Sequence, residues 1–293
     1  MRATYRLATG AGTGPDPRRG TGRAADLAWS IMRVHVVSDV HGNVEALRRA
    51  GDGADALLVL GDLVDFVDYH DPAGGIIGHV LGPEVSYRFG QLRASGRPGE
   101  LVAYDRERWA ELPDAAAVVE EAVRTQYAAL FAALTAPTWA IPGNVDLPRL
   151  WPEFARPGLC LPDGRVVEIG GLRVGFVGGA PLPPGREPHR GGPWYPHVLR
   201  AQDYAVAVDG LGPVDLLCSH VPPAVPELAY DVVARRAEAS APALLDKVRR
   251  DRPRAALSGH VHQPLAARVR VGRTECVNVG HFQRTGVPYV LQW

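Results

Sequence analysis

Two side chains with metal-binding chemistry, Asp39 and His41, stand two positions apart directly after the apolar run Val34–Val37. A carboxylate oxygen and an imidazole nitrogen at this spacing can bind one divalent ion. The apolar run indicates a buried strand, while Gly42 lets the chain turn and Asn43 can cap a following helix. Strand ends that lead into helices are where open α/β sheets place their ligands.

Four more turns of this kind follow, each directly after an apolar segment. The polar residues at the five turns are, in chain order, Asp39 and His41, Asp62, Asn144, His220, and His260 with His262. Each of them alone also has a structural interpretation as a turn, cap or packed residue, but five such turns in one chain indicate a metal site. The set is too large for one four-coordinate ion and suits two ions that share a carboxylate and clamp a phosphoryl group.

Strands and helices alternate from Met32 onward and must position these turns. The expected strands are Val34–Val37, Ala56–Leu60, Thr138–Ile141, Val166–Ile169, Leu172–Val177, Val214–Cys218, Ala255–Leu257, Ala266–Val271, Thr274–Val279 and Val287–Gln292. The expected helices are Val44–Ala50, Pro113–Leu134 and Ala241–Arg250, the long one with Val118, Ala122, Tyr127, Leu130, Phe131 and Leu134 at helical spacing. Residues 66–112 are rich in Gly, Pro and aromatic residues and are expected to be irregular.

Composition limits the classes of protein to consider. The 293 residues carry 32 basic and 32 acidic side chains, and a formal net charge of zero argues against dedicated nucleic-acid binding. No apolar run reaches transmembrane length, and the N-terminus lacks the apolar core of a signal peptide. Cys160, Cys218 and Cys276 are odd in number and widely spaced. They indicate reduced, mostly buried thiols in a cytoplasmic protein.

The N-terminal segment differs from the rest of the chain. Within residues 1–31, the stretch Thr9–Gly22 consists mostly of Gly, Thr, Pro and Arg. We expect residues 1–31 to form a disordered extension, either a genuine flexible arm or an upstream extension of a protein that starts at Met32. Residues 32–293 form the expected domain, with a cap-like insertion at about 66–112. This insertion and a second segment, 181–204, contain aromatic and basic residues that either contact substrate or belong to solvated loops with a few packed aromatics.

The ordered motifs D-x-H, G-D, G-N, H and G-H-x-H resemble those of the calcineurin-like metallophosphoesterase superfamily, from about Met32 to Trp293. The resemblance implies an α/β fold, a four-layer sandwich of two mixed β-sheets flanked by helices. It also implies two divalent metal ions, such as Mn, Fe or Zn, at the sheet edge. By this resemblance one ion is bound by Asp39, His41 and His262, the other by Asn144, His220 and His260, and Asp62 bridges them.

Three residues depart from the family pattern. Many members carry a histidine after the metal-binding asparagine, whereas Val145 stands here and can donate no proton, as in branches that resemble bacterial phosphodiesterases. The protein Ser/Thr phosphatase branch carries two arginines where this chain has Phe66 and Pro142, so a protein phosphatase is not expected. His281 closes an N-x-G segment that also resembles the family, and we expect a surface histidine there, or else the replacement proton donor.

The resemblance therefore implies a metal-dependent phosphoesterase. The expected reaction is hydrolysis of a small or nucleotide-like phosphodiester by a metal-bound hydroxide at a dinuclear centre. Two alternatives remain open, a phosphomonoesterase and a non-catalytic metal-binding scaffold of the same fold. The expected partners are a small-molecule phosphoester and the two metal ions, with neither a membrane nor nucleic acid.

Overall fold

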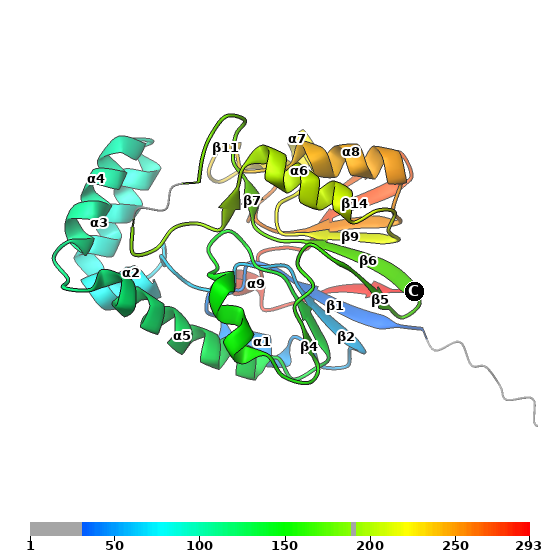
Figure 1. Cartoon of the computed structure of the whole chain (residues 1–293), viewed down its shortest axis with the longest axis horizontal. Coiled ribbons are helices and arrows are strands. Elements are labelled where there is room, and N and C mark those ends of the chain that lie inside the picture. Colours follow the sequence, from blue (N-terminus) through cyan, green and yellow to red (C-terminus); the bar gives the residue numbers. More distant parts are fainter. Residues whose placement is uncertain (1–30, 189–191) are drawn as a thin grey trace, which may run out of the picture. The chain divides into compact units, whose positions relative to one another are not determined.

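The computed structural model describes residues 31–188 and 192–293. Within these residues, two mixed β-sheets pack face to face and helices cover their outer faces (Figure 1). The prediction of an α/β, four-layer sandwich is thereby confirmed. The predicted disorder of residues 1–31 concerns residues that, apart from Ile31, lie outside the described part of the chain, as do His189 and Arg190 of the 181–204 segment.

The first sheet holds three of the five predicted turns. Its strands, in spatial order, are β15 (Tyr289–Gln292), β1 (Arg33–Val37), β2 (Ala56–Val59), β3 (Thr138–Ala140) and β4 (Leu159–Cys160). β15 is antiparallel to β1, whereas β1, β2, β3 and β4 run parallel. Parallel neighbours end at the same edge of a sheet. The turns after β1, β2 and β3, which carry Asp39, Asp62 and Asn144, therefore lie side by side.

The second sheet holds the remaining two turns. Its strands, in spatial order, are β13 (Arg268–Val271), β14 (Thr274–Asn278), β12 (Ala255–Ser258), β9 (Leu216–Ser219), β6 (Leu172–Val177) and β5 (Val166–Ile169). The inner strands β14, β12, β9 and β6 are parallel, and both outer strands are antiparallel to their neighbours. His220 follows β9 and His260 follows β12, so both histidines leave the same edge of this sheet.

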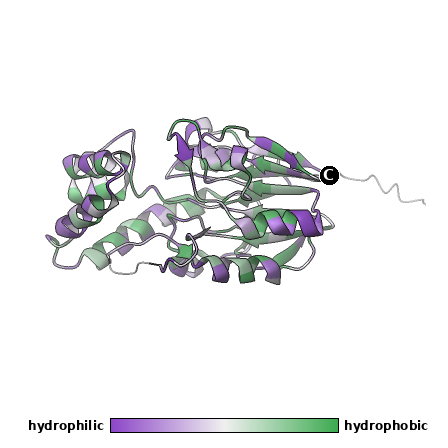
Figure 2. Ribbon diagram, turned by 90° about the horizontal axis from the view of Figure 1, so that it is seen from above, coloured by the Kyte–Doolittle hydropathy of each residue, from purple (hydrophilic) through white to green (hydrophobic). Residues whose placement is uncertain are grey.

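Alternating side chains of the strands build the layers. In β2, Leu58 packs between the sheets, whereas Leu57 and Val59 face the helices on the other side. The helices on the first sheet include α1 (Val44–Arg49), α5 (Ala115–Ala133), the short 3-10 helix η1 (Pro148–Phe154) and α9 (Phe282–Thr285). Those on the second are α6 (Ala201–Gly210), α7 (Pro226–Ala229) and α8 (Pro242–Asp251). Several helices show hydrophobic and hydrophilic bands, as expected for amphipathic helices (Figure 2).

In the first turns of the long helix α5, the buried face is displaced by one residue from the predicted one. Val118, expected in the core, is 39% exposed, whereas Val119 and Val123 are fully buried. Tyr127, Leu130 and Phe131 are buried as predicted, so the face is displaced only in the first turns. Adjacent valines at 118 and 119 make the apolar stripe ambiguous in sequence, and tertiary packing selects one of them.

The predicted irregular segment at 66–112 is largely helical, so that prediction is wrong. It forms α2 (Gly75–Leu81), α3 (Pro83–Ala94) and α4 (Pro98–Trp109) beside the sheets (Figure 1). Proline stands in the first turn of both α3 and α4, where it starts a helix rather than breaking one. Ile76, Ile77 and Trp109 join the core on α5 and anchor the insertion to the domain.

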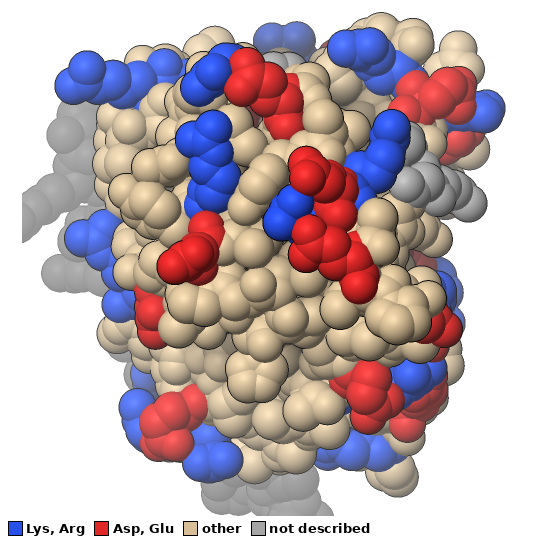
Figure 3. Space-filling model, turned by 90° about the vertical axis from the view of Figure 1, so that its left-hand side faces the viewer, with Lys and Arg blue, Asp and Glu red and all other residues tan. Residues whose placement is uncertain are grey.

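Short elements complete the described chain. Two ribbons pair β7 (Ala180–Pro181) with β8 (Val198–Leu199) and β10 (Tyr230–Asp231) with β11 (Arg236–Ala237). Cys218 and Cys276 are buried, Cys160 is half-buried, and all are free thiols. Of the helices in the described ranges, none has the length and hydropathy needed to cross a bilayer. Basic and acidic side chains are interspersed on the face seen from the side of α3 and α4 (Figure 3).

The single lysine of the chain, Lys247, is fully buried on α8. Its Nζ donates to Asp251 Oδ2 at 2.7 Å and to the Gly212 carbonyl at 2.5 Å. A buried ammonium group is tolerated only when such partners compensate its lost hydration. The contact ties α8 to the segment that follows α6.

Replacing this ammonium should destabilise the fold. In Lys247→Met, the mostly buried Asp251 carboxylate loses one partner but keeps Arg250 at 2.9 Å. We therefore expect a loss of about 2 kcal/mol, below the ~3–5 kcal/mol for a carboxylate left with no partner. Urea denaturation measures it. Arg249→Met, at an exposed site on the same helix, is the matched control and should change stability by less than about 0.5 kcal/mol. Equal stability of wild type and Lys247→Met would contradict the assigned role.

Candidate metal centre

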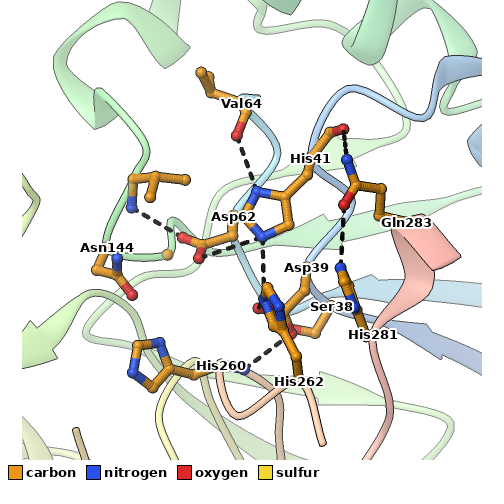
Figure 4. A network of polar contacts seen from close by, with 12 residues as sticks. Ser38, Asp39, His41, Asp62, Val64, Asn144, His260, His262, His281 and Gln283 are labelled. Atoms are coloured by element: carbon orange, nitrogen blue, oxygen red, sulfur yellow. Dashed lines mark hydrogen bonds and ion pairs between the residues drawn. The ribbon is translucent and has the colours of Figure 1, made fainter. Parts of the chain in front are cut away.

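The polar residues of all five turns converge at the carboxyl ends of the two sheets. Figure 4 shows those of the turns that carry Asp39, Asp62, Asn144 and His260. Three groups of side chains place potential ligand atoms within 4.8 Å of one another. The groups are Asp39 with His41 and Asp62, Asp62 with His220 and His260, and His41 with His262 and His281. Asn144 joins the second group, because its Oδ1 lies 3.0 Å from His220 Nε2. The structure therefore brings all seven predicted residues together.

The histidine tautomers direct lone pairs into this cluster. Nδ1 of His220 lies 2.8 Å from the Leu60 carbonyl, and Nδ1 of His41 lies 3.3 Å from the Val64 carbonyl. A carbonyl can only accept, so both Nδ1 atoms carry the proton and a neutral ring presents a lone pair at Nε2. His220 Nε2 faces Asp62 Oδ2 at 3.4 Å. Acceptors that face one another at this distance repel unless a proton or a cation lies between them.

Two buried atoms of the cluster also lack a hydrogen-bond partner. Within the described residues, Asp39 Oδ1 and His260 Nε2 are closed to solvent and accept no hydrogen bond. His262 Nε2 lies 3.5 Å from the same Asp39 oxygen, beyond good hydrogen-bond geometry. Buried polar atoms without partners are rare and costly. Oxygen and nitrogen donors left in this state fit divalent transition metals.

Several of these residues adopt a strained backbone. Asp39, His41, Asp62 and His260 have positive φ angles of 57°, 39°, 53° and 67°. Residues other than glycine adopt this region at an energetic cost, and such outliers gather at functional sites. The tight turns point side chains from successive strands at one place.

Glycines let the turns approach one another. A Cβ atom on Gly143 would lie 2.1 Å from Asp62 Oδ1, and one on Gly259 would lie 1.9 Å from Ser38 Oγ. Both distances are far below van der Waals contact, so only glycine fits at these two positions. The two glycines therefore let neighbouring turns approach each other closely.

Burial and pairing oppose each other in setting the pKa values. Burial raises the pKa of the Asp39 and Asp62 carboxyls, but neighbouring histidines outweigh it. His262 holds the pKa of Asp39 far below its usual range, and His220 lowers that of Asp62 to about 2. Burial lowers the pKa of His220, but Asp62 raises it to about 9. Burial lowers the pKa of His260 to about 4. Both carboxylates are therefore ionised at neutral pH, as metal binding requires.

The expectation that His281 is a surface histidine is wrong. Only 8% of His281 is exposed, and its ring stacks on His262 with the centroids 3.7 Å apart. Its Nε2 lies 3.2 Å from Gln283 Oε1, while Gln283 Nε2 donates to the His41 carbonyl. His281 follows β14, a parallel strand of the second sheet, and that position is the signal that could have placed it at the centre.

Asp146 holds two of the turns together and is missed as a site residue by sequence reasoning. Its buried carboxylate accepts hydrogen bonds from the amides of Leu63, Val64 and Gly143, and from the Tyr127 hydroxyl. Burial raises its pKa to about 6. The contacts join the turn after β2 to the turn after β3 and to α5.

Asn278 plays the same part in the second sheet. Its Nδ2 donates to the carbonyls of Gly259 and Val261, on either side of His260, and its Oδ1 accepts from the Gly280 amide. The side chain thus shapes the turn that carries His260 and His262. Both Asp146 and Asn278 are buried polar residues with no ligand atom in the cluster.

Two of the three departures from the family pattern, Phe66 and Val145, contact the side chain of Trp194. Trp194 stacks on Phe66 with the ring centroids 4.1 Å apart, and its Nε1 donates to the Val145 carbonyl at 3.3 Å. Trp194 is half-buried, and among the aromatic residues of the insertion Trp109 is buried, whereas Tyr69 and Tyr87 are more than half exposed. The packed-aromatic alternative therefore holds for Trp109 and Trp194.

Comparison with known proteins agrees with this geometry. Residues 32–264 match the family described as calcineurin-like phosphoesterase. One solved structure aligns with a TM-score of 0.58 at 16% sequence identity, over 89% of this chain and 95% of its own. Another, TT1561 of Thermus thermophilus, aligns with a TM-score of 0.53 at 16% identity, over 89% of this chain and 99% of its own. No curated protein matches the sequence.

The family match spans most of the chain, so the protein belongs to the calcineurin-like phosphoesterase family. It is a metallophosphoesterase, a hydrolase of phosphoric ester bonds. The family uses divalent metal ions and acts on small phosphoesters. At their low identity, the two solved structures show the shared fold alone.

Weakening the Asp146 contacts should loosen the centre without removing a candidate ligand. In Asp146→Asn, an amide replaces an oxygen that faces backbone N–H donors, so at least one donor loses its acceptor. We expect about 10–100-fold weaker metal binding, measured by titration of the metal-free protein. Asp215→Asn is the control, since Asp215 Oδ2 accepts one amide, that of Arg173, at the opposite end of the second sheet. Unchanged metal affinity in Asp146→Asn would contradict the positioning role.

Proposed function

We propose that this protein hydrolyses phosphodiesters of small or nucleotide-like alcohols at a centre of two divalent ions. One ion is held by Asp39, His41 and His262, the other by Asn144, His220 and His260, with Asp62 shared between them. The observation that carries this proposal is the place of Asp62 in two separate groups of ligand atoms. A carboxylate common to both groups suits a bridge between neighbouring ions.

Backbone groups of the chain orient the side chains that would hold the two ions. The Leu60 and Val64 carbonyls fix the rings of His220 and His41 with Nε2 inward. The Val145 amide holds Asp62 Oδ1 at 2.9 Å, which leaves Oδ2 directed at the histidines. When bound, two divalent ions supply a Lewis acid for the phosphoryl oxygens and lower the pKa of a water nucleophile.

The preference for diesters follows from side chains that bind no anion. Phe66 and Pro142 stand where the phosphatase branch carries arginines, and neither can contact a phosphoryl oxygen as a guanidinium does. Phe66 is instead packed under Trp194. A phosphodiester carries one negative charge, whereas a monoester carries up to two, so a site without these arginines favours the diester.

The free thiols bear on where the protein acts. Cys160, Cys218 and Cys276 form no disulfide. Free thiols suit a reducing compartment, and we propose the cytoplasm as the place of action. Residues 32–293 would form the catalytic domain, with the helical insertion at 66–112 as its cap.

Metal content tests the proposed centre directly. We expect about two ions per chain after mild loading, measured by elemental analysis. Asp62→Ala should lose both ions and activity while keeping its circular dichroism spectrum, because apolar residues pack the strands. Asp52→Ala, an exposed site between α1 and β2, serves as control and should retain both ions. A folded wild type that binds one ion or none contradicts the dinuclear proposal.

The missing proton donor at Val145 predicts a dependence on the leaving group. Expulsion of an alkoxide needs a proton, and a general acid contributes about 10²–10⁴-fold. Activated aryl diesters should therefore react far faster than alkyl esters, with a steep fall in rate as leaving-group pKa rises. Val145→His should raise rates for poor leaving groups more than for good ones.

The same substitution has a matched control. Val145 is half-buried, and its amide and carbonyl bonds do not depend on its side chain. Val145→Leu adds bulk without a proton donor and should keep the steep wild-type dependence. A wild-type rate independent of leaving-group pKa, with chemistry rate-limiting, would show that a general acid already exists.

A further inference from the structure

A cavity of about 550 Å³ adjoins the candidate metal centre and has no role in the account above. His41 and Gln283 line it on the side of the centre, and Asp65 and Asp68 line it near the insertion. Gln126 of α5 closes another side. This volume suits part of a small-molecule ligand. His41 belongs to both places, so the cavity and the centre share a wall.

Most polar side chains of this cavity are already engaged with the protein. Asn43 Oδ1 caps α1 through the Ala46 amide, and its Nδ2 donates to the Gln283 carbonyl. Gln126 holds the backbone of Asp65 from both sides, with bonds of 2.9 Å to its amide and 3.0 Å to its carbonyl. The Gln283 amide is shared between His281 and the His41 carbonyl. These groups shape the cavity and leave little capacity for a ligand.

The Asp65 carboxylate, by contrast, has no partner. Asp65 is only 9% exposed, and no donor in the described residues forms a hydrogen bond to its side chain. Asp68 adds a second carboxylate, whose Oδ1 is used by the amides of His70 and Asp71. Burial, with the charge of Asp68, raises the pKa of Asp65 to about 7. A buried carboxylate without a partner favours a cation or a proton beside it.

From this geometry we infer that the cavity binds a primary ammonium group on one ester arm of the substrate, with Asp65 as its main contact. The phosphoryl group would lie at the metal centre and the ammonium group at Asp65 and Asp68, so the ligand's charges match those of the two places. The inference rests on the proposed function, because it assumes a phosphodiester at the centre. It narrows the substrate class to aminoalkyl phosphodiesters.

A pair of substrates of equal size tests the inference. The metal-loaded enzyme is assayed with p-nitrophenyl 2-aminoethyl phosphate and with p-nitrophenyl propyl phosphate, and the ratio of the two kcat/KM values is compared. We expect wild type to favour the amine by about tenfold or more, as for a hydrogen bond to a charged group. Asp65→Asn should bring the ratio close to one, and Asp203→Asn, an exposed acidic residue on α6, should leave it unchanged.

Binding without turnover separates this inference from the proposed function. Calorimetric titration of the metal-loaded protein with 2-aminoethyl phosphate and with propyl phosphate should show tighter binding of the amine, lost in Asp65→Asn. Hydrolysis of both diesters with a ratio near one, or equal binding of the two phosphates, overturns the ammonium site and leaves the diesterase proposal standing. Preferential binding of the amine without hydrolysis of either diester supports the site and overturns the diesterase proposal.

Discussion

Acceptor atoms that face one another across a buried space dominate the structure of this protein. Around the imidazole Nε2 of His220, Asn144 Oδ1 lies at 3.0 Å and Asp62 Oδ2 at 3.4 Å. None of them can donate to another when the ring is neutral and protonated at Nδ1. Despite burial, Asp62 raises the pKa of His220 to about 9, so a proton on Nε2 offsets this repulsion, and rigid turns hold the atoms where a cation can replace that proton. The positive φ angles of Asp39 and Asp62 show that the backbone of these turns is strained in order to hold the polar atoms close together.

The rigidity comes from two layers of buried contacts. Apolar side chains between the sheets, such as Leu58 and Phe176, fix the distance between the two sets of strand ends. Asp146 and Asn278 then bind backbone groups of the turns themselves, one in each sheet. Slippage of a strand by one residue would move each side chain to the other face of the sheet, so strand register also fixes where each polar side chain points.

Sequence alone predicts the longer strands and the polar residues that end them, because continuous apolar runs and abrupt changes to Asp, Asn or His are local features, whereas the two-residue strands such as β4 are missed. The helices α2, α3 and α4 are missed, since proline in a first turn resembles proline in a loop. Asp146 and His281 are missed for another reason. Their partners, such as Tyr127 and His262, lie far away in the chain, and only the fold brings them within reach. The register of α5 at Val118 depends likewise on packing.

The buried position of Lys247 has a consequence for chemical labelling. The ε-amino group of this residue is the only lysine amine in the sequence, and it is fully buried and bonded to Asp251. An acylating reagent must wait for α8 to detach before it reaches that nitrogen. The modification rate at this one position therefore reports how often the second sheet loses its helical cover, a local opening read by mass spectrometry without any added probe.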